Sequence, residues 1–353
     1  MKRLFFPAIL IFSAAGLAAQ QPAAIPRTKQ FLSPVYRIDR KYRSEEGPWA
    51  RESIRLGDTG THELLWITGM RTEMVGADAA TPMLPEFMCH ASLNFEDLER
   101  HRATFGWGSQ GIARIVALSQ GQLSARFPSG YGVPLMSDEN LTLTTRVLNH
   151  NLPDARLTVR HRVSIEFLRD ADLRQPMQAL RNVVGHVLVP LEANPSHGHD
   201  HTSHLDGDDD LAGVAAPTMV AGVLKDSSGR QFVGHWVVKP GREVRRKNVT
   251  ETLQIPFDTT LHFSAAHLHP FAESLELRDL TTGESVIKLS AGQLRKGIGM
   301  DHVDSFSSAS GIPLYKDHQY QMVSVYNNTT SVDQDSMAVM FLFVLDRQFR
   351  RPI

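Results

Sequence analysis

Residues 157–168 read LTVRHRVSIEFL, and residues 336–346 read SMAVMFLFVLD. Both are short runs rich in Val, Leu and Phe, and the first alternates apolar with polar side chains, as a half-buried β-strand does. Similar runs, among them HELLWITGM, IARIVALSQ and YQMVSVYNN, recur along the chain between Gly, Pro, Asn and Asp. Few segments keep helical spacing for more than two turns. We therefore predict an all-β protein built from antiparallel, jelly-roll-like β-sandwiches.

The length of 353 residues predicts two tandem domains. The most polar interruption between the strand-like runs is RDADLRQPMQ, residues 169–178. We place the domain junction there, which gives an N-terminal sandwich over residues 36–170 and a C-terminal sandwich over residues 171–350.

The N-terminus has the pattern of an export signal. Lys2 and Arg3 precede an apolar run that is too short to span a bilayer comfortably, and small residues follow it. We expect residues 1–19 to be a signal peptide and the proline-rich residues 20–35 to be a linker. The mature chain is expected in the periplasm or outside the cell, with no membrane span left after cleavage.

Charge and cysteine content restrict the function. The chain has 37 Lys and Arg against 38 Asp and Glu, a net charge of -1, which argues against binding to nucleic acid or to an anionic membrane surface. Cys89 is the one cysteine, so no disulfide can form within the chain. A single thiol in an exported protein is either buried and inert or bound to a metal.

Candidate metal ligands lie in strand-like segments of both halves. His267 and His269 form an HxH pair, and residues i and i+2 of a strand project from the same face. Met337 adds a thioether, and two imidazoles with a thioether suit cuprous copper better than zinc, calcium or magnesium. Each residue alone is also compatible with an ordinary polar face or an apolar core.

Residues 196–210 form a separate histidine-rich and aspartate-rich segment, SHGHDHTSHLDGDDD. Several imidazoles on one loop could collect divalent or cuprous metal. The other interpretation is a solvated insertion whose histidines bind metal only adventitiously.

The C-terminal half resembles the copper type II, ascorbate-dependent monooxygenases, the family of peptidylglycine α-hydroxylating monooxygenase and dopamine β-hydroxylase. The resemblance rests on VKPGREVRRKNVTETLQIPFDTTLHFSAAHLHPFAESLELRD, residues 238–279, and on LYKDHQYQMVSVYNNTTSVDQDSMAVMFLFV, residues 314–344. These contain the family's proline-glycine turn, its HxH strand and its copper-binding methionine in the same order. In the N-terminal half the resemblance is weaker and rests on MCHASLNF and LTTRVLNHN.

The resemblance implies two β-sandwiches, each with one copper ion, that face each other across a solvent-filled cleft. His267, His269 and Met337 would bind the copper that meets dioxygen and substrate. His90 and His150 would belong to the electron-transfer copper of the N-terminal domain. The family has two adjacent histidines where this chain has Cys89 and His90, so Cys89 is a further candidate ligand.

The function implied is hydroxylation of a substrate C–H bond with dioxygen and an external reductant such as ascorbate. Peptide-hydroxylating members clamp a substrate carboxylate with an arginine and a tyrosine at positions that are here Ala265 and Phe341. Neither residue can make a bidentate carboxylate contact. Peptidylglycine is therefore not the expected substrate.

Two other functions remain open from the sequence. One is a non-enzymatic periplasmic protein that buffers or delivers copper, which the altered Cys89-His90 motif favours. The other is a metal-free β-sandwich module that recognises a carbohydrate or another protein. A serine or cysteine hydrolase is disfavoured because the chain has no GxSxG motif.

Overall fold

The computed structural model describes residues 25–107, 112–191, 223–225 and 229–352. Within this part the protein is all-β, as the sequence predicts, with antiparallel sheets and two short α-helices. None of the helices in it is long and apolar enough to cross a membrane. The expected signal peptide, residues 1–19, and the histidine-rich segment, residues 196–210, lie outside the described residues.

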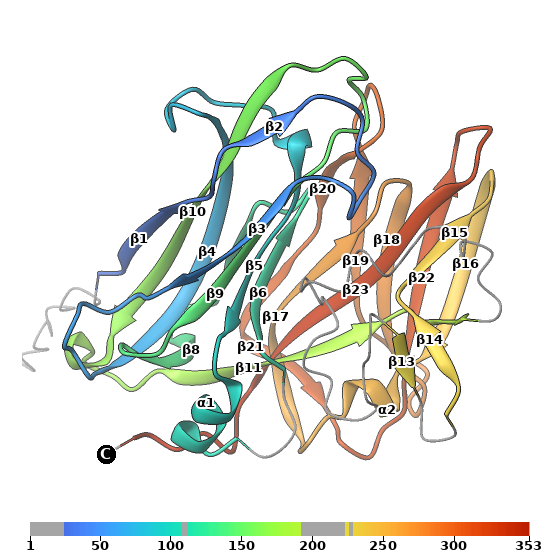
Figure 1. The fold of residues 1–353 in the computed structure, drawn as a ribbon. Helices are drawn as coiled ribbons and strands as arrows, with labels where there is room; N and C mark the ends of the chain where they lie inside the picture. The colour runs from blue at the N-terminus through green and yellow to red at the C-terminus, as the bar shows by residue number, and fades with distance from the viewer. Residues whose placement is uncertain (1–24, 108–111, 192–222, 226–228, 353) are drawn as a thin grey trace, which may run out of the picture.

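The strands form one long sheet and three smaller ones (Figure 1). The long sheet has the order β1-β10-β4-β8-β11-β23-β17-β21, and β2, β7 and β15 pair with its members. Its strands are β1 (Arg27–Leu32), β2 (Tyr36–Ile38), β4 (Leu64–Gly76), β7 (Ser124–Arg126), β8 (Tyr131–Met136), β10 (Leu157–Arg169), β11 (Gln178–His186), β15 (His235–Val238), β17 (Thr259–Leu268), β21 (Phe306–Leu314) and β23 (Gln334–Leu345).

The smaller sheets complete the two halves of the molecule. Their orders are β3-β9-β5-β6 in the N-terminal half, and β16-β22-β18-β19-β20 and β12-β14-β13 in the C-terminal half. The strands are β3 (Trp49–Ile54), β5 (Met88–Phe95), β6 (Arg114–Ser119), β9 (Leu141–Val147), β12 (Val189–Pro190), β13 (Val223–Lys225), β14 (Gln231–Val233), β16 (Gly241–Asn248), β18 (Ala272–Asp279), β19 (Ser285–Gln293), β20 (Met300–Val303) and β22 (Tyr320–Asn328), with helices α1 (Leu98–Phe105) and α2 (Thr250–Leu253) and 3-10 turns η1 (Pro85–Phe87) and η2 (Asp170–Asp172).

The long sheet folds around the sheet that contains β5 and β6. Strands β4, β10 and β17 all contact that sheet, with β4 and β10 on one side of it and β17 on the other (Figure 1). The two parts of the long sheet are joined by β8 and β11. These strands pair in parallel, with Gln178 opposite Tyr131 and Ala179 opposite Gly132. Beyond β17 and β23, the sheet that contains β18 and β22 forms the outer layer of the C-terminal half (Figure 1).

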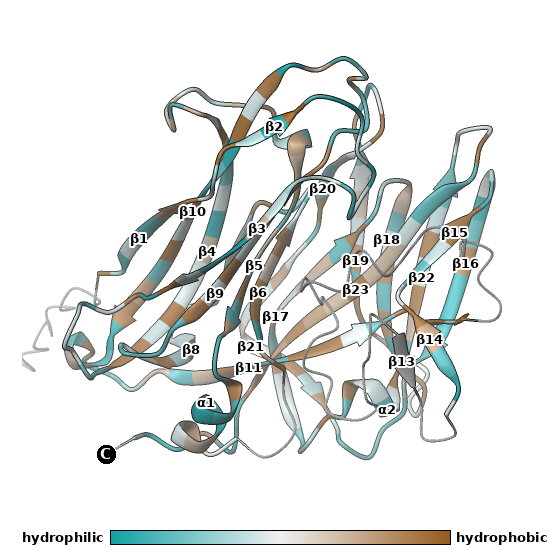
Figure 2. Cartoon of the chain, in the orientation of Figure 1, coloured by the Kyte–Doolittle hydropathy of each residue, from teal (hydrophilic) through white to brown (hydrophobic). Residues whose placement is uncertain are grey.

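Strand β23 contributes to two hydrophobic cores. Phe341 and Phe343 pack into the core of the N-terminal half, whereas Met340, Leu342 and Val344 pack into the core of the C-terminal half. Because both faces of the strand are covered, its sequence is an unbroken apolar run. Figure 2 shows the same hydrophobic character along the strands of the middle layers.

The two halves touch directly where the resemblance implies a solvent-filled cleft. Phe127 of the N-terminal half lies with its ring centroid 5.4 Å from that of Phe263 and 4.7 Å from that of Phe343. Ala265 and Phe341, the positions of the family's carboxylate clamp, pair with each other and are buried in this same contact. The implied cleft is therefore wrong for this part of the interface, because aromatic side chains fill it.

The expected linker, residues 20–35, is also partly wrong. Residues 27–32 form β1, which pairs with β10 along its whole length, from Arg27 opposite Phe167 to Leu32 opposite Arg162. This segment is polar because β1 is an edge strand with most of its side chains in solvent.

His161 of β10 is a buried histidine whose pKa predicts a pH dependence of stability. Burial lowers the pKa of His161 to about 3, although its Nε2 donates to the carbonyl of Arg146 over 3.0 Å. In the unfolded chain the pKa is near 6.5, so below that pH only the unfolded state takes up this proton. The contribution of His161 to the free energy of unfolding is therefore fully present above pH 6.5. It falls by about 1.4 kcal/mol per pH unit as the pH drops toward 3.

We expect His161→Gln to unfold at a lower urea concentration at pH 7 but to lose less stability than wild type between pH 6.5 and 4.5. Urea unfolding across this range measures the two slopes. The exposed His302 supplies the control, since His302→Gln should keep the wild-type slope. Equal slopes in His161→Gln and wild type would contradict the assignment.

Candidate metal centre

Three candidate metal donors lie side by side across β15, β23 and the end of β17. Two of them, Met337 and His269, are predicted from the sequence, and the third, His235, is not. His235 is paired with Met337 across β15 and β23, and the backbone N–H of His269 donates to the carbonyl of Met337 over 3.4 Å. Residues opposite each other in an antiparallel sheet share a face. Met337 packs with the N-terminal core, so this row of side chains faces the N-terminal half.

The HxH pair behaves as the strand period predicts. The ring centroids of His267 and His269 lie 5.4 Å apart, and those of His235 and His269 lie 5.2 Å apart. An imidazole nitrogen bonds a metal at about 2.0–2.1 Å, so two rings on one tetrahedral ion would have centroids about 5 Å apart. Each of these two pairs of rings therefore already has the spacing of two ligands to one ion.

Asp335 joins two of these rings. It lies two residues before Met337 on β23, and its Oδ2 is 3.3 Å from Nδ1 of His235 and 3.1 Å from Nδ1 of His269. Burial by itself would raise the pKa of Asp335, but the neighbouring His235 and the contacts from both histidines outweigh it and hold the pKa well below its usual range. Asp335 is therefore an ionised carboxylate at neutral pH.

The side chain of His269 is buried with one unused ring nitrogen. It is 3 % exposed, its Nδ1 faces the carboxylate of Asp335, and its Nε2 has no hydrogen-bond partner among the described residues. Buried polar nitrogens of this kind are rare without a partner. The hydroxyl of Tyr326 donates to the carbonyl of Met337 and accepts from the backbone N–H of His269 over 3.3 Å, which fixes the backbone at both ligand positions.

The N-terminal candidates gather around a β-bulge in β5. The register with β9 shifts between Met88 and His90, which leaves Cys89 as the extra residue. Adjacent residues of a regular strand point to opposite faces, but a bulge redirects one of them. As a result, ligand atoms of Cys89, His90 and Glu45 all lie within 4.8 Å of one another.

Glu45 is held in place by both its backbone and its carboxylate. Its φ of 69° lies in the left-handed region, which is uncommon for a residue other than glycine. One carboxylate oxygen pairs with Nη1 of Arg146, and the other lies 3.7 Å from Nδ1 of His90. The second oxygen is thus directed toward the cysteine and the histidine.

The donors of the two halves meet at the interface. The ring centroid of His90 lies 6.1 Å from that of His267. Burial and the nearby charge of His269 lower the pKa of His150 to about 4, while Asp335 opposes this shift. His150 is therefore close to the C-terminal donors as well, although the resemblance implies that it serves the N-terminal copper.

The sequence predicted six of these donors and missed three. The structure brings His90 and His267 near each other, places His269 beside Met337, and buries Cys89. The missed residues are Asp335, His235 and Glu45. Asp335 was detectable, because residues i and i−2 of a strand share a face. For His235 and Glu45 no local pattern exists, since each reaches the site through pairing or a bulge distant in sequence.

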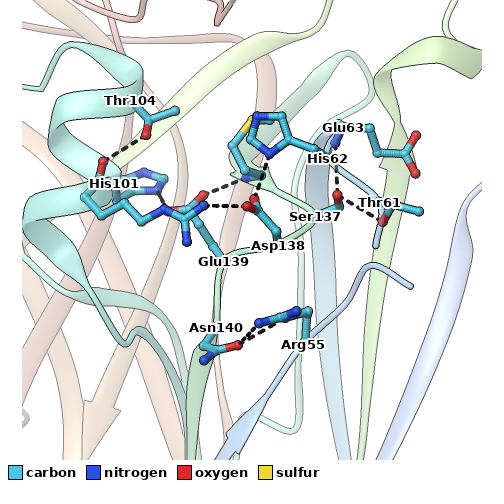
Figure 3. Close-up of polar contacts among 12 residues, drawn as sticks. Arg55, Thr61, His62, Glu63, His101, Thr104, Ser137, Asp138, Glu139 and Asn140 are labelled. Carbon is cyan, nitrogen blue, oxygen red and sulfur yellow. Dashed lines mark hydrogen bonds and ion pairs between the residues drawn. The ribbon is translucent and has the colours of Figure 1, made fainter. Parts of the chain in front are cut away.

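His101 is a buried histidine that lies outside the candidate metal centre (Figure 3). Its ring stacks on Phe95 at a centroid distance of 3.6 Å, and its Nδ1 lies 3.0 Å from a carboxylate oxygen of Glu139. The other oxygen of Glu139 accepts from the backbone N–H of Met136. Burial lowers the pKa of His101 despite Glu139. The groups of described residues that could hold a metal do not include His101.

Comparison with known proteins gives little guidance. No protein-family model matches the chain, and no curated protein matches it. The crystal structure of the STIV MCP is 10% identical over 91% of this chain and 97% of its own, with a TM-score of 0.30. The CUB1-EGF-CUB2 domain of human MASP-1/3 is 10% identical over 90% of this chain and 99% of its own, with a TM-score of 0.16. Such low TM-scores carry no functional argument, and the function must be inferred from the site itself.

Proposed function

We propose that this chain is an exported, copper-dependent monooxygenase that hydroxylates a C–H bond with dioxygen and an external reductant such as ascorbate. The observation that carries the proposal is the row of His269 and Met337, with His267 beside it, buried between the two halves. The balanced reaction takes one dioxygen, two electrons and two protons, and gives the alcohol and one water.

The donor set fits copper. Imidazoles with a thioether bind cuprous copper in preference to zinc, magnesium or calcium. Met337 is 4 % exposed and His267 is 3 % exposed, so a bound ion would be shielded from bulk water. In the N-terminal half, Cys89 and His90 with Glu45 would hold a second ion, and a thiolate also favours the cuprous state.

The protein's own contribution is to hold the donors and exclude water. Bound copper would supply the one-electron chemistry with dioxygen that hydroxylation requires. The buried donors fix the position of the ion, whereas the side chains of His235 and Asp335 are 23 % and 33 % exposed. We therefore assign substrate and reductant to the side of the centre where these two residues lie.

Met337→Leu is the direct test of this function. The change nearly conserves volume, so we expect a loss of stability below about 1.5 kcal/mol. Ascorbate-dependent oxygen consumption and the sulfur scatterer assigned to Met337 in copper X-ray absorption should both be lost. Met340→Leu makes the same change on the opposite face of β23 and should leave both unchanged. Wild-type oxygen consumption in Met337→Leu would refute the assignment.

A copper carrier is the second candidate, and one observation favours it. His90 and His267 come from different halves, yet their ring centroids are 6.1 Å apart. Such a continuous path of donors could pass an ion between the halves. A carrier would bind copper without oxygen-dependent consumption of reductant, so the same experiment separates it from the enzyme. Failure of the wild type to retain any copper would favour a metal-free module.

A further inference from the structure

His269 has two different kinds of donor near it. His267 and Met337 are buried, and Met337 offers a soft thioether. His235 and Asp335 are partly exposed, and Asp335 offers a carboxylate. Soft donors select cuprous ion and carboxylates favour divalent ions. His269 is thus shared by a set of donors that prefers cuprous ion and a set that prefers divalent ions.

We propose that His235, His269 and Asp335 form a second, harder ligand set that takes the divalent ion. The soft set then holds cuprous copper, and His269 is the ligand common to both. This inference rests on the proposed copper site and specifies how that site would accommodate both oxidation states of copper.

The distances around Asp335 fit this role. Its Oδ2 lies 3.1 Å from Nδ1 of His269 and 3.3 Å from Nδ1 of His235. Two ligand atoms that each bond a tetrahedral ion at about 2.0–2.1 Å are about 3.3 Å apart. The three donor atoms therefore need only small shifts to bind one ion.

The second nitrogen of the His269 ring adds to this argument. Nδ1 already lies 3.1 Å from the carboxylate oxygen of Asp335, whereas the buried Nε2 has no hydrogen-bond partner among the described residues. A buried ring nitrogen without a partner is rare. The ring therefore has a donor atom beyond its contact with Asp335, as a ligand common to two sets requires.

Metal selectivity tests the two sets separately. We would measure the affinity of purified full-length protein for Zn²⁺, a redox-inert probe of the hard set, and for Cu⁺, a probe of the soft set. All variants carry Cys89→Ala and asparagine for each histidine of residues 196–210, so that these donors do not compete. Asp335→Asn should weaken Zn²⁺ binding about 10–100-fold with little change for Cu⁺, and Met337→Leu should do the reverse.

Two matched variants control for charge and packing. Asp333→Asn removes the same charge at an exposed position two residues earlier, and Met340→Leu repeats the methionine change on the other face of β23. Neither should alter either affinity. Equal effects of Asp335→Asn on both ions, or no effect on Zn²⁺, would overturn the second ligand set and leave the proposed copper site standing. If the reference protein, in which all C-terminal donors are intact, does not bind Cu⁺, the proposed function is rejected instead.

Discussion

His269→Ala is expected to abolish both Cu⁺ and Zn²⁺ binding at the C-terminal centre. His269 contacts Asp335 and also lies beside His267, so neither proposed donor set is complete without it. Loss of an outer-shell partner already costs about 10–100-fold in metal affinity, and we expect the loss of this shared ligand to exceed about 100-fold. Competition titrations with Cu⁺ and Zn²⁺ chelators measure both losses in one protein.

A control must separate ligand loss from loss of a buried ring. His262→Ala removes another buried imidazole from the same strand, where His262 stacks on Tyr131 and bonds the carbonyl of Ser308 away from the centre. It should keep both affinities even if it lowers the unfolding temperature. Retention of either metal at wild-type affinity by His269→Ala would remove this residue from the centre.

Phe343→Ala is expected to destabilise the whole molecule by about 3–5 kcal/mol. Phe343 is 1 % exposed and packs against Phe127 of the N-terminal half and Phe263 of the C-terminal half. The cavity left by its ring would therefore open at the contact between the halves. We expect one cooperative transition that moves as a whole, rather than selective unfolding of the C-terminal half.

Urea unfolding with hydrogen exchange followed in β9 and β18 tests this expectation, because these strands report on different halves. Val332→Ala, at an exposed position before β23, should stay within about 0.5 kcal/mol of wild type. Separate transitions for β9 and β18 in Phe343→Ala would show that the halves unfold independently, and the shared contact would then carry little of the stability.

The sequence predicted the parts of this molecule that depend on local pattern. Residues 157–168 and 336–346 lie almost entirely in strands β10 and β23, and the period of two placed His267 and His269 on one face. These predictions succeed because strand geometry fixes side-chain direction over a few residues. The all-β class follows from the same repeated pattern.

The remaining features depend on contacts between distant segments. β15 pairs with β23 about a hundred residues later, so His235 shows no local signal of its place beside Met337. The bulge that turns Cys89 and His90 toward Glu45 is set by the pairing of β5 with β9. The closed contact between the halves likewise depends on β17 and β23 each having two buried faces, which an apolar run alone does not reveal.

The shared position of β23 also determines the order in which this protein can mature. β23 comes after every other strand along the chain, yet its side chains complete both cores. Neither core can close before the last strand has emerged and paired, and folding dominated by such distant pairings is slow. Met337 and Asp335 lie on that strand. A metal at the proposed centre would therefore be loaded only after the chain has folded.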